Sequence, residues 1–425
     1  MTAPDVSPTR LVVVGQGYVG LPVAIRAVEA GFSVVGLDTD TLRIWSLKDG
    51  QSYVGDVSKA RLCRAMAGGR YRPTESYEDA EGFDAAIITV PTPLTESVPD
   101  LSFVVAAVKG LAPHLRPGAT VVLESTTYPG TTEELVVPLL EAGSGLVAGQ
   151  DFSVGYSPER IDPGNPRWNF VNTPKVVSGV DARSLAAVRH LYDRLVDTTV
   201  PVGTTREAEL TKLLENTFRH VNIALINEIA VFAHELGVDV WKAIEAASTK
   251  PFGFSRFLPG PGVGGHCLPI DPSFLSWRVR HDLRREFRFV ALANDINDHM
   301  PDYVVERLTS ALNRQSKSVQ HSVVLLLGLA YKAGTGDTRE SPVLRVIDLL
   351  SARGAVIRVV DSHVEEHRCP LSAKLVELTA DELRAADVVL LLTDHAEVDY
   401  ALVEREARLV LDTRHRLSGP RVEHL

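Results

Sequence analysis

The sequence predicts an α/β protein with two doubly wound parallel sheets that are joined by a long central helix. An apolar strand at 11–14 leads directly into a glycine-rich turn at 15–20. After residue 320, a second series of apolar strands alternates with helical segments. Between the two series, residues 207–236 contain no glycine or proline and repeat apolar residues at three- and four-residue spacing, which is typical of a helix.

Composition indicates a multidomain protein without a nucleic-acid-binding or membrane-binding surface. A chain of 425 residues is too long for one ordinary core, and its net charge of −10 argues against a basic surface for nucleic acid or anionic lipid. The three cysteines are widely spaced, so we expect neither disulfides nor a metal site. Residues 1–8 lack a signal-peptide pattern and no apolar run could span a bilayer, so we expect a cytoplasmic protein.

The first sheet begins with a Rossmann-like dinucleotide-binding unit. A strand, a Gly-x-Gly-x-x-Gly turn, a helix and a second strand at 33–37 follow one another, and the second strand ends at Asp38. The glycines let a pyrophosphate lie on the helix N-terminus. Asp38 is placed to accept hydrogen bonds from ribose hydroxyls and to repel the 2′-phosphate of NADP, so the pattern predicts NAD. The predicted contacts in the turn are Gly15, Gln16, Gly17, Tyr18, Val19 and Gly20.

Polar residues follow the later strands of this sheet, at 84–90, 120–124 and 152–156. Thr92, Ser125 and Thr126 follow the first two, where ligands of open α/β sheets bind, so they are candidate cofactor contacts. Helix capping is the alternative role for each. Glu159 follows the third strand and lies next to Pro158, and it is either a catalytic acid or base or an ordinary solvated carboxylate.

The middle of the chain contains a long helix and a loop rich in glycine and proline. Lys212 and Asn216 lie four residues apart on one face of the helix, where they could reach one site or simply face solvent. The loop at 259–272 contains Cys267 and Asp271 among four glycines and several prolines. We expect Cys267 to be a covalent nucleophile; the loop by itself is equally compatible with a buried structural cysteine.

The last part of the chain predicts a second doubly wound sheet without the glycine fingerprint. Its strands are expected at 322–328, 354–361, 386–392 and 408–412. Lys332 and Arg339 lie in the loop after the first of these strands, and Arg414 follows the last. We expect these three cations to form a pocket for an anionic ligand such as a diphosphate.

Together these segments resemble the nucleotide-sugar 6-dehydrogenase family, which comprises the UDP-glucose/GDP-mannose dehydrogenases. The resemblance covers essentially the whole chain. The segments that carry it are 15–22, 91–93, 125–132, 157–159, Lys212 with Asn216, 264–271 and 331–342. It implies an NAD-binding Rossmann domain at 1–200, a central helical domain with the cysteine loop and the dimerisation helix at 201–312, and a UDP-sugar-binding Rossmann-like domain at 313–425.

The resemblance also implies a four-electron oxidation. The C6 hydroxyl of a UDP-sugar would be oxidised to the uronic acid with two NAD⁺, through addition of Cys267 to the aldehyde and a thioester that water hydrolyses. Lys212, Asn216 and Asp271 match positions that stabilise oxyanions and organise water. Glu159 matches the general base of hydrolysis.

The resemblance further implies binding roles and an assembly. Arg43 and Arg339 match cofactor contacts, Lys332 matches a sugar-nucleotide contact, and Arg414 matches a residue that reaches a neighbouring subunit's site. We also expect the sugar nucleotide to contact Glu159, Arg160, Lys212, Asn216, Arg256 and Gly264. Members are typically dimers built on the long helix, so we expect a homodimer or a higher homo-oligomer.

The exact sugar is predicted from departures within the family. UDP-glucose enzymes usually carry lysine where this chain has Ile270, and a second glutamate where it has Pro163. Segments 157–165 and 250–254 look instead like the UDP-N-acetylglucosamine 6-dehydrogenase branch. UDP-N-acetylmannosamine and UDP-glucose are the alternatives. Two alternatives come from other functional classes. One is a non-catalytic protein that binds a sugar nucleotide, and the other is a 3-hydroxyacid dehydrogenase, which needs no cysteine.

Overall fold

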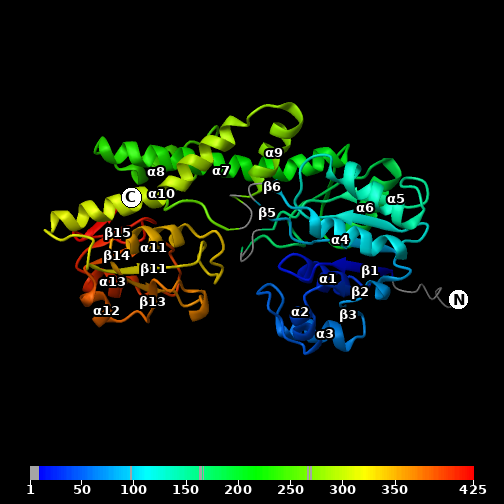
Figure 1. Cartoon of the computed structure of the whole chain (residues 1–425), viewed down its shortest axis with the longest axis horizontal. Coiled ribbons are helices and arrows are strands. Elements are labelled where there is room, and N and C mark those ends of the chain that lie inside the picture. The colour runs from blue at the N-terminus through cyan, green and yellow to red at the C-terminus, as the bar shows by residue number, and fades with distance from the viewer. Residues whose placement is uncertain (1–8, 96–97, 162–164, 166, 266–267, 269) are drawn as a thin grey trace. The chain divides into compact units, whose positions relative to one another are not determined.

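The computed structural model describes residues 9–95, 98–161, 165, 167–265, 268 and 270–425 (Figure 1). The chain divides into two compact units. The first unit comprises Met1–Glu215 with Trp277–Leu283, and the second comprises Asn216–Ser276 with Arg284–Leu425. Two helices, α7 (Thr205–Glu235) and α9 (Asp271–Leu283), contribute residues to both units.

The first unit is built on a six-stranded parallel sheet with the order β3-β2-β1-β4-β7-β8. In chain order its strands are β1 (Arg10–Val14), β2 (Ser33–Leu37), β3 (Tyr71–Thr74), β4 (Ala85–Ile88), β7 (Thr120–Leu123) and β8 (Ser153–Tyr156). The strand order reverses between β1 and β4, and in such sheets ligands bind outside the carboxyl ends of the strands at this point.

Both faces of this sheet are covered, which explains why its strands are continuous apolar runs. Leu11 and Val13 of β1 pack in one hydrophobic cluster with α1, whereas Val12 and Val14 pack in a second cluster with α4 and α5 on the other face. The helices are α1 (Gly20–Glu29), α2 (Thr41–Lys48), α3 (Lys59–Ala67), α4 (Ser102–Leu111), α5 (Val137–Ser144) and α6 (Ala182–Tyr192). Short elements complete the unit: β5 (Leu94–Thr95), β6 (Val98–Pro99), β9 (Lys175–Val177), β10 (Thr199–Pro201), η1 (Tyr77–Ala80), η2 (Ala112–His114) and η3 (Thr132–Val136).

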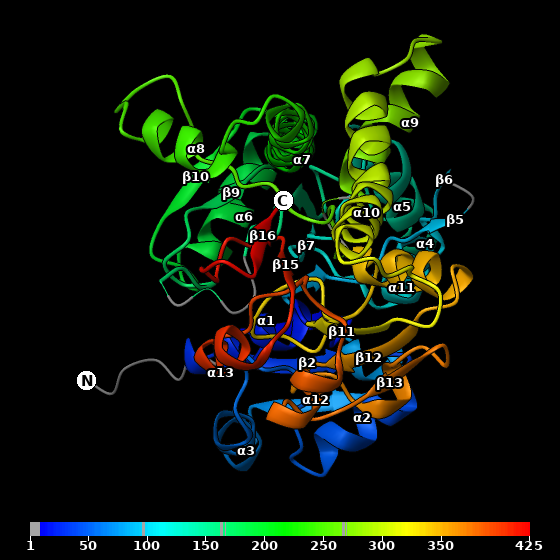
Figure 2. The same cartoon turned by 90° about the vertical axis from the view of Figure 1, so that its left-hand side faces the viewer.

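The second unit repeats the same topology in a six-stranded parallel sheet with the order β13-β12-β11-β14-β15-β16. Its strands are β11 (Val323–Leu327), β12 (Val356–Val360), β13 (Ala373–Leu375), β14 (Val388–Leu391), β15 (Val410–Asp412) and β16 (Val422–His424). One face packs against α10 (Arg288–Arg314) and α11 (Pro342–Ala352), and the other against α12 (Ala380–Ala385) and α13 (Tyr400–Glu406) (Figure 2). The remaining helices are α8 (Val240–Ser248) and the short η4 (Glu366–Arg368).

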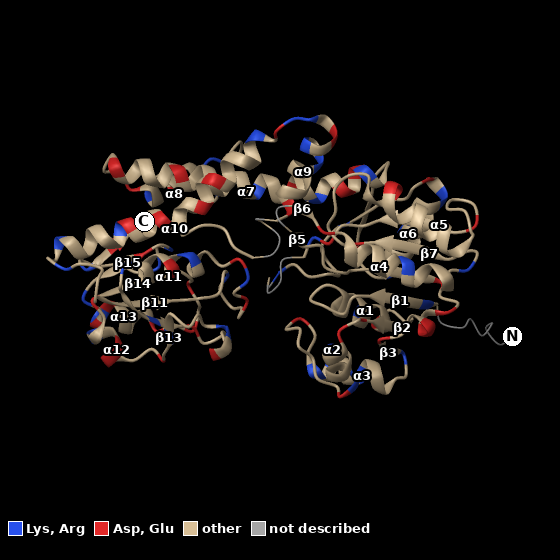
Figure 3. Cartoon of the chain, viewed as in Figure 1, with Lys and Arg blue, Asp and Glu red and all other residues tan. Residues whose placement is uncertain are grey.

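The predicted fold class is confirmed: two doubly wound parallel sheets and a long helix between them in the sequence. Figure 3 shows acidic and basic residues interspersed along helices α7 and α10. No helix in the described part of the chain is long and apolar enough to cross a bilayer. Cys63 and Cys369 are free thiols.

Candidate active site

The glycine-rich turn of the first unit has the geometry that a dinucleotide requires. Gly15 has φ +90°, and a Cβ on it would lie 2.8 Å from the carbonyl oxygen of Thr89. A Cβ on Gly20 would lie 1.7 Å from the carbonyl oxygen of Gly15, so the turn closes only with glycine at both positions. The N-cap of α1, Val19, makes no side-chain capping hydrogen bond. The helix N-terminus is therefore open to an anion, and the turn fits the pyrophosphate of NAD.

Asp38 lies at the end of β2 as predicted. Its Oδ2 accepts a 2.7 Å hydrogen bond from the Gln16 amide, its Oδ1 accepts one from the Asp40 amide at 2.9 Å, and the Arg43 guanidinium lies 3.4 Å from Oδ2. The Gln16 side chain is fully buried and accepts a hydrogen bond from the Tyr71 hydroxyl. A contact from Gln16 to a cofactor would therefore come from its backbone.

The other predicted cofactor residues of this unit lie beside the turn or beyond the carboxyl ends of β4 and β7. Tyr18 is 54% exposed. Thr92 is buried, and the Ser125 hydroxyl donates to the Val90 carbonyl at 2.7 Å. The N-cap residues of the elements that follow are Leu101 and Thr131, so Thr92, Ser125 and Thr126 do not have the helix-capping role that was their alternative. Their contact with the cofactor stays a prediction.

Glu159 belongs to a buried cluster of charges that sequence reasoning missed. Lys175 Nζ lies 3.1 Å from Glu159 Oε2 and 3.1 Å from Glu124 Oε1, and the three side chains are 4%, 12% and 0% exposed, respectively. Glu159 Oε1 also accepts hydrogen bonds from the amides of Arg160 and Ile161, at 2.7 and 2.6 Å. Glu159 is therefore not an ordinary solvated carboxylate.

The rest of this cluster surrounds Glu124. Its Oε1 also accepts a hydrogen bond from the Tyr192 hydroxyl, and its pKa is raised because burial outweighs the attraction of Lys175. The pKa of Lys175 is raised as well, because the two carboxylates more than offset its desolvation. The only signals of this cluster in the sequence were Lys175, which is the first residue of the apolar strand β9, and Glu124, which directly follows β7.

Two further predicted residues adjoin Glu159 in the first unit. Lys212 Nζ donates a 2.6 Å hydrogen bond to the Glu159 carbonyl oxygen. The Arg160 guanidinium pairs with both carboxylate oxygens of Glu215, at 3.1 and 2.6 Å, and also donates to the Pro174 carbonyl. The structure thus brings Glu159, Arg160 and Lys212 together, although they come from a loop and from α7.

In the second unit, the structure pairs Asn216 with Asp271. The Asn216 amide donates a hydrogen bond to Asp271 Oδ2, and Asp271 is 3% exposed at the first position of α9. Cys267 lies outside the described residues, so its role as nucleophile stays a prediction.

The glycines before Cys267 pack closely against other predicted binding segments of the second unit. A Cβ on Gly264 would lie 2.7 Å from the Glu340 carbonyl oxygen, and the Gly265 amide donates to the Arg339 carbonyl at 3.3 Å. A Cβ on Gly260 would lie 2.7 Å from the Arg414 guanidinium. The loop at 260–265 is thus held between the 331–341 loop and Arg414.

The predicted basic residues of the second unit differ in their surroundings. Arg414 donates through Nε to the Leu392 carbonyl at 2.6 Å, which fixes its guanidinium beside Gly260. The Arg339 guanidinium pairs with Asp337, with 2.7 Å between Nη2 and Oδ2. Arg256 is exposed. The expected three-cation pocket of Lys332, Arg339 and Arg414 stays a prediction.

Comparisons with known proteins agree with this organisation. Models of the UDP-glucose/GDP-mannose dehydrogenase family match three parts of the chain: its NAD binding domain at 9–196, its central domain at 206–299 and its UDP binding domain at 325–419. The chain is 36% identical over 419 residues to the UDP-N-acetyl-D-mannosamine dehydrogenase of Pyrococcus horikoshii, with 97% of each protein covered. It is 34% identical over 422 residues to an NDP-N-acetyl-D-galactosaminuronic acid dehydrogenase of Ralstonia solanacearum, with 96% of each covered.

A comparison with solved structures also finds nucleotide-sugar dehydrogenases. The structure of a UDP-D-ManNAc dehydrogenase from Pyrococcus horikoshii superposes with a TM-score of 0.88 at 34% identity, covering 98% of this chain and 99% of the other. The names of the two Pyrococcus horikoshii proteins agree with the N-acetylmannosamine alternative better than with the N-acetylglucosamine branch that the local segments predicted. Matches over nearly the whole length show that the chain belongs to the UDP-glucose/GDP-mannose dehydrogenase family and is an NAD-dependent nucleotide-sugar dehydrogenase.

Proposed function

We propose that the protein oxidises the C6 hydroxyl of UDP-N-acetylmannosamine to the carboxylate, with two NAD⁺ consumed per sugar. The family supplies the reaction class, and the printed activities of the Pyrococcus horikoshii proteins support the sugar. UDP-N-acetylglucosamine, which segments 157–165 and 250–254 favour, is the second substrate to compare. A non-catalytic binding role does not account for the set of polar contacts around the predicted catalytic residues.

The observation that carries the proposal is that α7 makes a polar contact with a predicted catalytic residue in each unit. Lys212 contacts the main chain of Glu159 in the first unit, and Asn216 contacts Asp271 in the second. Asp271 in turn follows Cys267 by four residues in the sequence. Helix α7 therefore offers a cation to the proposed base in the first unit and an amide to the start of α9, after the proposed nucleophile loop, in the second unit.

Each of these residues has a chemical role in the proposal. After the first oxidation produces the aldehyde, the Cys267 thiolate adds to C6, and Lys212 and Asn216 stabilise the resulting oxyanion by hydrogen bonding. The second oxidation converts this adduct to a thioester. Glu159 then takes a proton from the attacking water, and the carbon–sulfur bond breaks to release the acid and the Cys267 thiolate. Bound NAD⁺ accepts a hydride in each oxidation.

We propose that NAD and the sugar nucleotide are bound by different parts of the chain. Residues 1–200 bind NAD through the glycine turn, Asp38 and Arg43, with Arg339 as a further contact. Residues 313–425 bind the sugar nucleotide through Lys332 and Arg414. Arg160, Arg256 and Gly264 are proposed as further sugar-nucleotide contacts. The close packing of Gly264 and Gly260 against Glu340 and Arg414 supports this, because the segment before Cys267 then lies next to the segments proposed to bind the sugar nucleotide.

We further propose that the protein is a homodimer assembled on α7. The helix exposes large apolar side chains at three-, four- and seven-residue spacing, which is the pattern of a helix–helix seam. Leu214, Phe218 and Phe232 are 62%, 53% and 53% exposed, and Leu225 and Ile229 are 49% and 41% exposed. A second copy of the chain would cover this stripe, with the central segment 201–312 as the dimerisation domain.

The proposed activity is tested by measuring NADH formed per sugar with UDP-N-acetylmannosamine, UDP-N-acetylglucosamine and UDP-glucose. About two NADH per sugar are expected, with the highest kcat/KM for UDP-N-acetylmannosamine. Cys267→Ser should lose acid formation. The matched control Cys63→Ser should retain it, because Cys63 is an exposed free thiol whose hydrogen bond goes to the Gly50 carbonyl, away from the predicted catalytic residues. Full acid formation by Cys267→Ser would overturn the covalent route, and a higher kcat/KM for another sugar would overturn the substrate.

A further inference from the structure

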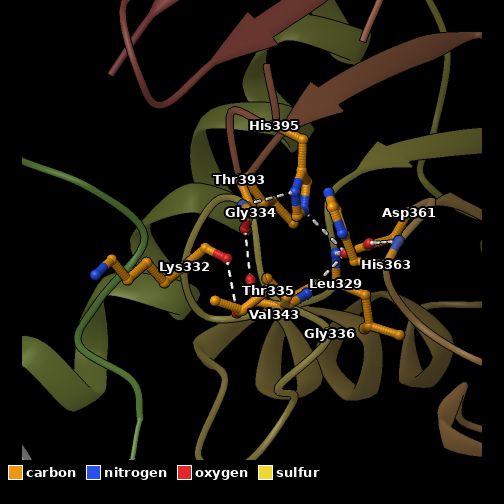
Figure 4. A network of polar contacts seen from close by, with 12 residues as sticks. Leu329, Lys332, Gly334, Thr335, Gly336, Val343, Asp361, His363, Thr393 and His395 are labelled. Atoms are coloured by element: carbon orange, nitrogen blue, oxygen red, sulfur yellow. Dashed lines mark hydrogen bonds and ion pairs between the residues drawn. The ribbon is translucent and has the colours of Figure 1, made fainter. Parts of the chain in front are cut away.

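The loop between β11 and α11 in the second unit has no regular secondary structure across 328–341, although it carries Lys332 and Arg339. Such a loop keeps one conformation only if particular side chains satisfy its backbone groups. The contacts that do this come from the segments that follow β12 and β14, the two strands that flank β11 in the sheet (Figure 4).

Asp361, the residue after β12, holds the start of the loop. Its Oδ2 accepts hydrogen bonds from the amides of Leu329 and Ala330, at 2.8 and 2.9 Å, and its Oδ1 accepts one from the amide of His363 at 2.9 Å. Burial alone would raise its pKa, but the hydrogen bond from His395 and those from the three amides lower the pKa to about 2. Asp361 is therefore a buried carboxylate whose hydrogen bonds are directed at the loop.

His395, which follows β14, connects this carboxylate to the middle of the loop. Its side chain is 1% exposed, Nε2 lies 3.1 Å from Asp361 Oδ2, and Nδ1 lies 3.2 Å from the Gly334 amide nitrogen. An amide N–H can only donate, so Nδ1 must be the unprotonated acceptor. The proton of the neutral ring is then on Nε2, which donates to Asp361. One tautomer thus satisfies both contacts.

The residues on both sides of Lys332 are fixed by this arrangement. Ala330 is held through its amide by Asp361 and through its carbonyl by the Thr393 hydroxyl at 2.6 Å, and Gly334 is held by His395. Further along, a Cβ on Gly336 would lie 2.1 Å from the His363 carbonyl oxygen, so the loop packs tightly there too. Figure 4 shows the Lys332 side chain extending away from the two histidine rings, out of the anchored part of the loop.

The same cluster also resembles a metal site, because His363, His395 and Glu397 offer ligand atoms within 4.8 Å of one another. Coordination by His395 would break one of its two hydrogen bonds, either to Gly334 or to Asp361. His363 stacks on His395 with 4.8 Å between ring centroids, and its Nε2 lies 3.3 Å from the exposed Glu397. The hydrogen-bond geometry therefore favours a role for His395 and Asp361 in fixing the loop over a role in binding a metal. We call this pair of residues the loop anchor.

We propose that His395, oriented by Asp361, is a positioning residue that holds the 329–341 loop so that Lys332 reaches the diphosphate of the sugar nucleotide. This inference rests on the binding role proposed above for Lys332. Loss of the anchor should weaken binding of the sugar nucleotide more than binding of NAD, because the glycine turn, Asp38 and Arg43 belong to the first unit and this loop offers NAD only the proposed Arg339 contact.

The test measures the Kd of UDP by calorimetry, and KM and kcat for the sugar nucleotide and NAD⁺, in the full-length protein. His395→Phe removes both hydrogen bonds and leaves the Gly334 amide without this acceptor. The Kd of UDP and the sugar-nucleotide KM should therefore rise roughly tenfold, with a smaller rise in the KM for NAD⁺. His395→Asn keeps an acceptor near Nδ1, so it should restore most of the affinity. His363→Gln is the matched control and should bind UDP like the unmodified protein.

Thr393→Val provides a second, milder variant, since it removes only the hydrogen bond to Ala330 and should raise the Kd of UDP severalfold. Lys332→Ala separates the two proposals. If Lys332→Ala weakens UDP binding but His395→Phe and Thr393→Val do not, the anchor is wrong and the binding role stands. If Lys332→Ala leaves UDP binding unchanged, the binding role itself is wrong. UDP affinity that is lost with a chelator and restored by Zn²⁺ would also overturn the anchor in favour of a metal site.

Discussion

Replacing Lys175 by methionine is the sharpest test of the buried charge cluster. The substitution keeps a long unbranched side chain but removes the ammonium group that lies 3.1 Å from both Glu124 and Glu159. Two carboxylates would then remain buried without the ammonium group that pairs with both of them. Breaking a buried ion pair in this way costs about 3–5 kcal/mol.

The pH dependence of that cost follows from linkage. A carboxyl group that must be protonated to stay buried costs about 1.4 kcal/mol for each pH unit above its ordinary pKa. At pH 7.5, roughly 3 units above the ordinary pKa of a glutamate, the cost is about 4 kcal/mol, and at pH 5.5 it is about 1.4 kcal/mol. The folded-state pKa of Glu124 is already raised by burial. The variant should therefore lose stability as pH rises, and its deficit should be smallest in mild acid.

The assay is thermal unfolding of both proteins at pH 5.5 and pH 7.5. For a unit of this size the deficit at pH 7.5 corresponds to a fall in Tm of roughly 8–16 °C. Lys242→Met is the matched control, because Lys242 pairs with Asp239 on the surface with its own side chain 81% exposed. It should change Tm little at either pH. A Lys175→Met protein as stable as the Lys242→Met protein at pH 7.5, or a deficit that does not shrink at pH 5.5, would refute the reasoning.

Three other predictions follow from single contacts. The pKa of Glu209 is raised to about 7, because burial outweighs its hydrogen bonds from Thr132 and Gly130. The stability that protonated Glu209 contributes is therefore present below its unfolded pKa and is lost as pH rises through 7. Glu209→Gln should flatten the fall in Tm between pH 5 and 8, and an unchanged profile of Tm against pH would contradict this. Asp38→Ser should raise the KM for NAD⁺ at least tenfold and lower that for NADP⁺, since it removes the carboxylate at the end of β2 and leaves the Arg43 guanidinium paired with Asp40 instead of Asp38. Unchanged KM values for both cofactors in steady-state kinetics would contradict this. Phe218→Asp should halve the mass measured by light scattering, whereas an unchanged mass would exclude α7 as the interface.

The fold was largely predictable because the central strands are buried on both faces. Their uninterrupted runs of valine, leucine and isoleucine, as in 323–327, reveal a covered parallel sheet. The edge strands were missed because they lack this pattern: β3 contains Arg72 and Pro73, and β13 contains Lys374. Helix α10 was missed as well; Pro301 lies within it.

The positions of site residues could be predicted where a residue follows a recognisable sequence motif. They could not be predicted where residues far apart in the sequence come into contact in the fold. Asp38 and Asp271 were found from the glycine turn and the cysteine loop. Lys175 meets Glu159 across 16 residues, and His395 meets Asp361 across 34, so neither pair has a local sequence signal. The sugar prediction differs from the relatives' printed activities for a related reason. N-acetylglucosamine and N-acetylmannosamine differ only in configuration at C2, which is distinguished by pocket shape more than by short motifs.

The central claim is that sulfur holds the half-oxidised sugar, and intact-protein mass spectrometry tests it most directly. In a Glu159→Gln protein, with hydrolysis slowed, mixing with NAD⁺ and UDP-N-acetylmannosamine should add the mass of the sugar-nucleotide acyl group at Cys267. The adduct should persist in the Cys63→Ser background. Continued formation of the uronic acid with no acyl group on Cys267 at any time would contradict the account.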